Sequence, residues 1–240
     1  MTEIGEGIAV VIQRLEQDKC VFCGKADHKE LNKEPINPTG WTRAEISGVG
    51  GNFVAKKKSI YPSNISPPAA YRSEGHHCLA FSSFIVDART SPKDRFAALN
   101  HYLKQEGYNP NNPNNTIDLP GRKSKGDTTA NANFKEFELA VLAGKPLQLH
   151  IGGHKQEFMS ASNMLILAVV TALQDSNACK KPPDDFKKKL KQKIIDAEDR
   201  AFKFTASTTS PWVAHPGPLK LAEAYVKKKH DIDSITYPQL

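Results

Sequence analysis

The sequence lacks an apolar run long enough to cross a bilayer. The longest such run, residues 164–173, has ten residues, about half of the roughly 20 that a transmembrane helix needs. Residues 1–6 are acidic where a secretory signal peptide would be basic, and residues 8–12 form only a short apolar stretch. We therefore expect a soluble protein with no signal peptide and no membrane partner, in which residues 164–173 belong to a buried helix.

Acidic residues are also fewer than basic ones. The 240 residues include 33 Lys and Arg against 26 Asp and Glu, which gives a formal net charge of +7. Basic side chains neutralise phosphates and release counterions, so this balance favours a polyanionic partner. Many proteins that bind no nucleic acid have a similar charge, and the balance alone assigns no function. The hydrophobic share of 39% and the charged share of 25% are those of a globular protein.

Cysteine is scarce, with four residues in the whole chain: Cys20, Cys23, Cys78 and Cys179. A chain of this length does not need disulfides to hold its core together. Cys20 and Cys23 have the spacing of half a zinc site, and His28 follows five residues later. No second pair has this spacing, so two interpretations stay open. The thiols are ordinary and reduced, or Cys20, Cys23 and His28 bind a structural Zn²⁺ with Cys78 as the fourth ligand.

Helical signals outnumber strand signals, and no internal repeat is evident. A helix is expected at residues 92–106, with Ser91 as its cap, Pro92 in its first turn and Gly107 directly after its end. A longer helix is expected after Gly152 and Gly153, with helical spacing of its apolar residues: Phe158, Ala161, Leu165, Ala168, Val169 and Ala172. Further helices are expected at 5–18, 134–143, 184–204 and 219–229, and strands at 52–55 and 116–119. The predicted fold is α+β and mostly helical.

Three features carry possible chemistry, and they follow one another along the chain. They are the pair His76-His77, Asn115 just before the strand at 116–119, and His150-Ile-Gly-Gly-His154. Each has an ordinary structural explanation when taken alone. Hydrolysis of a phosphodiester, however, needs a base to activate water and a cation to neutralise the phosphate. Their joint occurrence therefore favours a hydrolytic metal site.

The spacing of the histidines fits such a site. Neighbouring side chains on an extended segment point to opposite faces, so one of His76 and His77 can face a metal while the other faces water. Histidines four residues apart lie on one face of a helix, so His150 and His154 can converge on one cation. The two glycines between them weaken the helical interpretation, and the alternative is that His150 lies just before the helix.

In these residues the chain resembles a known family. It is similar to the HNH nucleases of the His-Me finger (ββα-metal) superfamily, in the subgroup named for an Ala-His-His motif and found in bacterial toxins. The resemblance covers residues 70–165 and includes Phe158, four residues after His154. Two positions depart from the family pattern: Gly75 stands where Ala is usual, and Thr116 stands where Gly is common.

The resemblance implies a role for each residue of these motifs. His76 would bind the catalytic metal, and His150 and His154 would complete its site. His77 would be the general base that deprotonates water, and Asn115 would tie the two strands together and orient that base. The metal would be Mg²⁺, Mn²⁺ or Zn²⁺.

The resemblance also implies an organisation of the chain. A ββα-metal core at residues 71–176 would be embedded among helices, with an N-terminal segment at 1–70 and a helical extension at 177–240. Arg122 lies outside the family motifs. From its chemistry, a guanidinium two residues after Pro120 could bind a phosphate, although an ordinary solvated loop charge is the favoured explanation.

The predicted function is that of a metal-dependent endonuclease that hydrolyses DNA, with RNA as the other possible substrate. The family resemblance implies an antibacterial toxin that a secretion system carries, without a signal peptide, into the cytoplasm of a target cell. It also implies a dedicated immunity protein, which the net positive charge predicts to be acidic.

Two alternatives belong to other classes. A non-catalytic, zinc-containing nucleic-acid-binding protein would explain the charge and Cys20 and Cys23, but not the histidines. A metallopeptidase is disfavoured because Ile151 follows His150 where that chemistry needs Glu.

Overall fold

The computed structural model describes residues 25–26, 41, 73–84, 95–121, 134–151, 154–175 and 178–239. The chain divides into two compact units. The described part of the first comes from Trp41, Ser82–Asn109 and Leu165–Ile194, together with Lys25 and Ala26. The described part of the second comes from residues 73–81, Pro110–Met164 and Ile195–Leu240. The division into 1–70, 71–176 and 177–240 stays a prediction.

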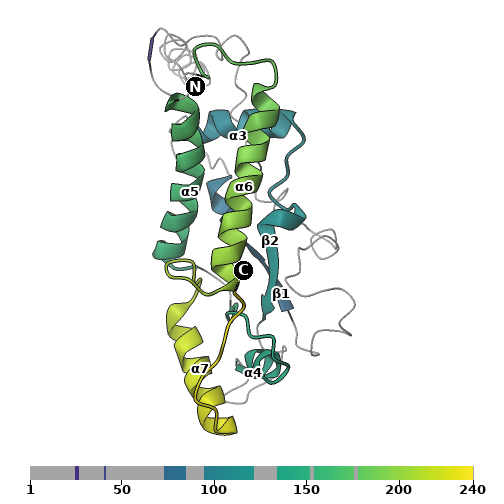
Figure 1. Ribbon diagram of the computed structural model, residues 1–240, viewed down its shortest axis with the longest axis vertical. Coiled ribbons are helices and arrows are strands. Elements are labelled where there is room, and N and C mark those ends of the chain that lie inside the picture. The colour runs from purple at the N-terminus through teal and green to yellow at the C-terminus, as the bar shows by residue number, and fades with distance from the viewer. Residues whose placement is uncertain are drawn as a thin grey trace, which may run out of the picture. The chain divides into compact units, whose positions relative to one another are not determined.

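The described residues are mostly helical, as predicted, and belong to an α+β fold (Figure 1). They form five α-helices, two short 3-10 helices and one antiparallel sheet of two strands. In chain order the elements are β1 (Ser73–His77), η3 (Phe81–Ser83), α3 (Arg95–Gln105), η4 (Pro113–Asn115), β2 (Thr116–Pro120), α4 (Lys135–Leu142), α5 (Gln156–Asp175), α6 (Phe186–Ala206) and α7 (Pro216–His230).

The sheet of the second unit carries the histidine pair. In the antiparallel register of β1 and β2, His76 lies opposite Ile117 and His77 opposite Thr116. The predicted strand at 116–119 is observed and extends to Pro120, whose carbonyl accepts a hydrogen bond from the backbone N–H of His150 at 2.8 Å. The segment that leads to α5 is therefore bonded to the end of β2.

The first unit contains the helix predicted at 92–106, observed as α3 from Arg95 to Gln105. Gly107 has φ of +64°, a left-handed conformation that glycine adopts without strain, so the helix ends there as expected. Buried aromatic rings form the core beside it. The Trp41 ring lies 5.8 Å from that of Tyr108, and Phe84 lies 5.7 Å from the same tyrosine.

The start of α7 differs from the prediction. The helix was expected from residue 219, after Pro216, Gly217 and Pro218, but it begins at Pro216 itself. The first turn of a helix has no intrahelical partner for its N–H groups, so proline is tolerated there. Helices α4 and α6 lie within two residues of their predicted bounds. The predicted helix at 5–18 and strand at 52–55 lie outside the described residues.

The prediction of which side chains α5 buries is wrong in part. Ala168 and Ala172, expected in the core, are exposed, whereas Ile166, Val170 and Leu173 are buried. Both sets have helical spacing, and larger side chains gain more from burial than alanine does. Within the described residues, Gln156–Leu173 is long and apolar enough to cross a membrane by length and composition, and 39% of that window is buried. Core helices of soluble proteins meet the same test.

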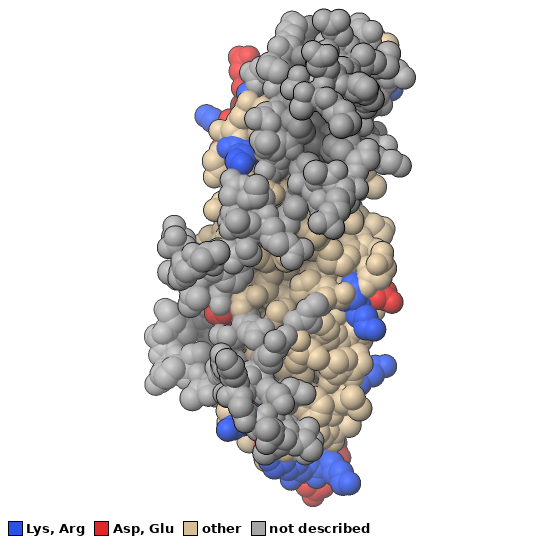
Figure 2. Space-filling model, turned by 180° about the vertical axis from the view of Figure 1, so that it is seen from behind, with Lys and Arg blue, Asp and Glu red and all other residues tan. Residues whose placement is uncertain are grey.

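Helices α4 and α7 pack against each other in the second unit. Their shared apolar core contains Phe137 from α4 and Leu219, Ala222 and Val226 from α7, with Leu149 from the segment before α5. The last turn of α7 is basic, and it contains Lys227, Lys228, Lys229 and His230. Figure 2 shows Lys and Arg side chains gathered at the lower end of the view, together with acidic ones. Positive charge in a last turn stabilises the helix dipole.

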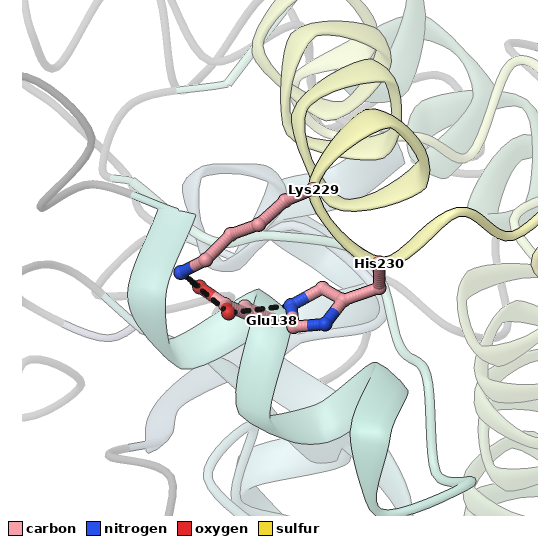
Figure 3. A network of polar contacts seen from close by, with 3 residues as sticks. All are labelled: Glu138, Lys229 and His230. Carbon is pink, nitrogen blue, oxygen red and sulfur yellow. Dashed lines mark hydrogen bonds and ion pairs between the residues drawn. The ribbon is translucent and has the colours of Figure 1, made fainter.

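An ion-pair network joins the same two helices (Figure 3). Glu138 of α4 lies 2.8 Å from Lys229 Nζ and 2.7 Å from His230 Nε2, both of α7. Burial alone raises the pKa of Glu138, but the hydrogen bonds from Lys229 and His230 outweigh it and the net pKa is lowered from its ordinary value. The folded state therefore favours the carboxylate.

We expect Glu138→Gln to lower the free energy of unfolding modestly at neutral pH. Because the pKa of Glu138 is lowered on folding, the stability it contributes is fully present above its unfolded pKa, about 4.3. It is lost as the pH falls through the folded pKa. Urea unfolding of wild type and variant from neutral to acid pH should therefore give curves that converge. Glu157→Gln, on the exposed start of α5, is the matched control. A difference that persists unchanged in acid would contradict the assignment.

Candidate metal centre

The neighbours His76 and His77 on β1 point to opposite faces of the sheet. The His76 ring lies against His150 and His154, with ring centroids 5.1 and 4.8 Å away. Nε2 of His77 is instead 2.8 Å from Oδ1 of Asn111. The alternation of a strand separates the two rings, as their sequence adjacency led us to expect.

Three histidines come together into a group that could hold a metal ion. One potential ligand nitrogen from each of His76, His150 and His154 lies within 4.8 Å of the others. The His150 and His154 ring centroids are 5.6 Å apart. Three imidazole nitrogens are a donor set that suits Zn²⁺ and other transition metals.

Of the two interpretations of His150 and His154, the shared helix face is wrong, and the position of His150 before the helix is confirmed. His150 and His154 do not share a helix face, because α5 begins only at Gln156 and both residues precede it. His150 is held at the end of β2 by its backbone bond to Pro120. His154 is followed directly by Lys155, whose N–H donates to the carbonyl of Ala214.

The environment of His76 fits a metal ligand. The residue is 1% exposed, and neither ring nitrogen has a hydrogen-bond partner among the described residues. Burying an imidazole with unsatisfied nitrogens costs free energy, so such a group in a native core calls for an explanation. Burial, followed by the nearby His150 and His154, holds the pKa of His76 well below its ordinary value. Neutral imidazole is the form that binds metals.

Aromatic rings close one side of the group. Phe158 of α5 is fully buried, and its ring centroid lies 5.0 Å from that of His76 and 4.8 Å from that of His154. Trp212 packs edge-on against Phe158 at 6.0 Å. The histidines therefore have an apolar wall, which limits the access of water from that direction.

His77 lies in its own partly closed environment. It is 8% exposed, and the Phe81 ring centroid is 5.5 Å from its own. Burial lowers the pKa of His77, and the opposing effect of the hydrogen bond with Asn111 is smaller. Asn111 was missed at the level of sequence because it stands in the Asn-Pro-rich stretch 109–115, which has the composition of a turn.

Asn115 joins the chain after β1 to the chain before β2. Its buried side chain accepts a hydrogen bond from the N–H of Leu79 at 2.7 Å and donates to the carbonyls of Leu79 and Pro110. The backbone carbonyl of Asn115 also accepts from the N–H of Cys78 at 2.8 Å. The Asn115 side chain thus fixes the backbone at Leu79, two residues after His77.

The turn that contains Asn115 is held by α6. Oδ1 of Asn112 accepts hydrogen bonds from the N–H groups of Asn114 and Asn115, which caps η4. Nδ2 of Asn112 donates to Oε1 of Glu198 at 2.7 Å, and this glutamate is fully buried in α6. A buried carboxylate therefore fixes the loop from which Asn111 reaches His77.

Cys78, the one other predicted ligand among the described residues, is not a member of this group. Cys78 is buried, and its assignment to a structural zinc site stays a prediction. Its proposed companions Cys20, Cys23 and His28, and the proposed phosphate contact Arg122, lie outside the described residues. His215 was not predicted, yet its ring centroid is 6.1 Å from that of His150 and 5.9 Å from that of His154. It belongs to no motif that could have revealed it.

Comparisons with known proteins add no relative from which a role could be transferred. No family model, curated protein or solved structure matches the chain. Assignment of a function therefore depends on the arrangement of these side chains.

Proposed function

We propose that this protein is a metal-dependent endonuclease with a ββα-metal core. The observation that supports this most strongly is the separation of two neighbouring histidines on β1. His76 faces the three-histidine group, and His77 faces away from it with its ring bonded to Asn111. The proposed ββα unit would consist of β1, β2 and α5, with α3 between the two strands and α4 between β2 and α5 in chain order, and with His154 two residues before α5.

His76, His150 and His154 would hold the divalent cation. When bound, the cation would supply positive charge that neutralises the charge developing on the phosphate. The buried, neutral His76 and the apolar wall of Phe158 suit this role, since a charge acts more strongly where water is limited.

His77 would be the general base. An amide oxygen can only accept a hydrogen bond, so Nε2 of His77 donates to Oδ1 of Asn111. The nitrogen that takes a proton from water is then Nδ1. Burial holds the pKa of His77 below its ordinary value, which keeps the imidazole in the neutral form that a base requires. Asn115 would position this base through the backbone of Cys78 and Leu79.

The substrate proposed is DNA, for which the formal charge of +7 gives general electrostatic support. The resemblance to toxin nucleases extends this proposal to an antibacterial toxin, which would be carried by a secretion system and neutralised by an acidic immunity protein. RNA is the other substrate to be tested.

A second candidate is a non-catalytic, zinc-containing nucleic-acid-binding protein. The observation that favours it is the burial of the metal group, since His76 is 1% and His150 is 9% exposed. A structural zinc site is closed to solvent, whereas a catalytic site leaves one position open to substrate.

A plasmid-nicking assay with Mg²⁺, Mn²⁺ or Zn²⁺ distinguishes the two candidates. We expect the endonuclease to convert supercoiled plasmid into nicked and linear forms with at least one of these ions, and EDTA to stop the reaction. An RNA substrate is run in parallel, and thermal melting verifies that each sample is folded. Folded, metal-loaded protein that cleaves neither nucleic acid would overturn the proposal and favour the binding protein.

A further inference from the structure

His215 is a fourth histidine beside the metal group, and no role has yet been assigned to it. It stands at the N-cap of α7, is 9% exposed, and lies near both His150 and His154. Its ring centroid is 5.9 to 6.1 Å from those two rings. The rings of His76, His150 and His154 are closer to one another, at 4.8 to 5.6 Å.

The backbone of Ala214, the residue before His215, forms hydrogen bonds on both sides of the segment 150–154. The N–H of Ala214 donates to Oε1 of Gln148 at 2.8 Å, two residues before His150. The carbonyl of Ala214 accepts from the N–H of Lys155 at 3.2 Å, one residue after His154. The position of His215 therefore depends directly on the segment that carries two of the candidate ligands.

The same loop is anchored on its other side. Gln148 is fully buried, and its Nε2 donates to the carbonyls of Thr205 and Trp212 at 2.9 and 3.4 Å. The Trp212 ring then packs against Phe158, which contacts the rings of His76 and His154. These bonds and contacts hold the backbone beside His215 next to the group, which lowers the entropy cost of a contact from its ring.

His215 is not a member of the three-histidine group, and its ring lies farther from His150 and His154 than those two rings lie from each other. A four-coordinate catalytic site with three protein ligands leaves one position for an oxygen of the substrate. A side chain that lies beside the metal ligands can reach the phosphate oxygens that do not bind the metal. A neutral imidazole has one N–H donor, and phosphate oxygens are strong acceptors.

We propose that His215 is a substrate-binding residue, whose ring donates a hydrogen bond to an oxygen of a phosphate group held at His76, His150 and His154. This inference rests on the proposed function, because it assumes that a phosphate is the group brought to the metal. It adds to that function a substrate contact from the N-cap of α7, outside the proposed ββα unit.

Inorganic phosphate binding by the Zn²⁺-loaded 240-residue chain tests this role without any cleavage reaction. The variant His215→Phe keeps a ring in the site but has no donor, and His215→Gln restores an N–H. Because the side chain of His215 does not cap α7, neither change removes a cap. Calorimetry would measure the affinity for Zn²⁺ first and for phosphate second, and thermal melting would verify the fold.

We expect His215→Phe to weaken phosphate binding by about 10- to 100-fold, the usual effect of losing a hydrogen bond to a charged group. Zn²⁺ affinity should change little, and His215→Gln should recover part of the phosphate affinity. If instead Zn²⁺ affinity falls as far as in His150→Ala, His215 is a metal ligand and the proposal is wrong. Unchanged phosphate affinity in folded His215→Phe would also overturn it.

The same experiment separates this inference from the proposed function. Wild type that binds Zn²⁺ and phosphate but cleaves no nucleic acid would contradict the endonuclease and leave the role of His215 in phosphate binding supported. An active nuclease in which His215→Phe binds phosphate normally would contradict only the inference.

Discussion

Replacing His77 with alanine is expected to lower the rate of phosphodiester cleavage by about 100- to 10,000-fold, the usual contribution of a general base. The residue is separated by the pleat of β1 from the group formed by His76, His150 and His154. Its removal should therefore leave metal binding nearly unchanged. The fold should also persist, because the principal backbone bonds of the adjoining loop come from Asn115 and not from the His77 ring.

Single-turnover cleavage of plasmid at saturating metal would measure this effect. Zn²⁺ affinity and the melting temperature are determined on the same samples. The matched control is His101→Ala. His101 belongs to α3 and lies outside the three-histidine group, so this variant should cleave at the wild-type rate. A folded His77→Ala protein that cleaves DNA as fast as wild type would exclude His77 as the base.

Replacing His76 with alanine is expected to weaken metal binding by at least about 100-fold, beyond the 10- to 100-fold that loss of an outer-shell partner commonly costs. His76 is the member of the group that comes from the sheet, and it is the most buried of the three. Without it, His150 and His154 offer two nitrogens, fewer than either structural or catalytic zinc sites use.

The same change should abolish stabilisation by the metal. A metal that binds only the folded state at 100 times its Kd stabilises it by about 2.7 kcal/mol. We therefore expect Zn²⁺ to raise the melting temperature of wild type but not that of His76→Ala. In EDTA the melting temperatures of the two proteins should differ less than a usual large-to-small core substitution would cause. The change also removes two buried nitrogens that have no hydrogen-bond partner among the described residues.

Thermal melts with Zn²⁺ and with EDTA, together with calorimetry, measure both effects. His76→Phe serves as a second variant, because it fills the volume that alanine leaves open and again removes the ligand atoms. If either variant bound Zn²⁺ with wild-type affinity, the three-histidine group would not be the metal site.

Local sequence signals predicted much of the secondary structure. Gly107 ends α3 because glycine adopts a left-handed φ without strain, and Thr116–Pro120 forms a strand beside the turn-rich stretch before it. The separation of His76 from His77 also follows from sequence alone, since any extended segment places successive side chains on opposite faces. These features depend on neighbours along the chain.

The composition of the site was predicted only in part. The motifs indicated His76, His150 and His154 together, but left open whether the last two share a helix face or His150 lies just before the helix. In the tertiary structure both precede α5: a backbone bond holds His150 at Pro120 of β2, and Lys155, the residue after His154, is bonded to Ala214. A bond between segments that are distant in sequence leaves no periodic trace in either of them.

The sequence by itself determined the helical α+β character, the two faces of the histidine pair and the residue types available for a metal. Only the tertiary structure decided that Asn111 holds His77, that Glu198 holds the loop of Asn111, and that His215 lies beside His150 and His154. Gln148 and Ala214, whose bond anchors His215, are 66 residues apart in the chain. The physical reason is that such contacts depend on packing between elements, whereas propensity and periodicity act only within one.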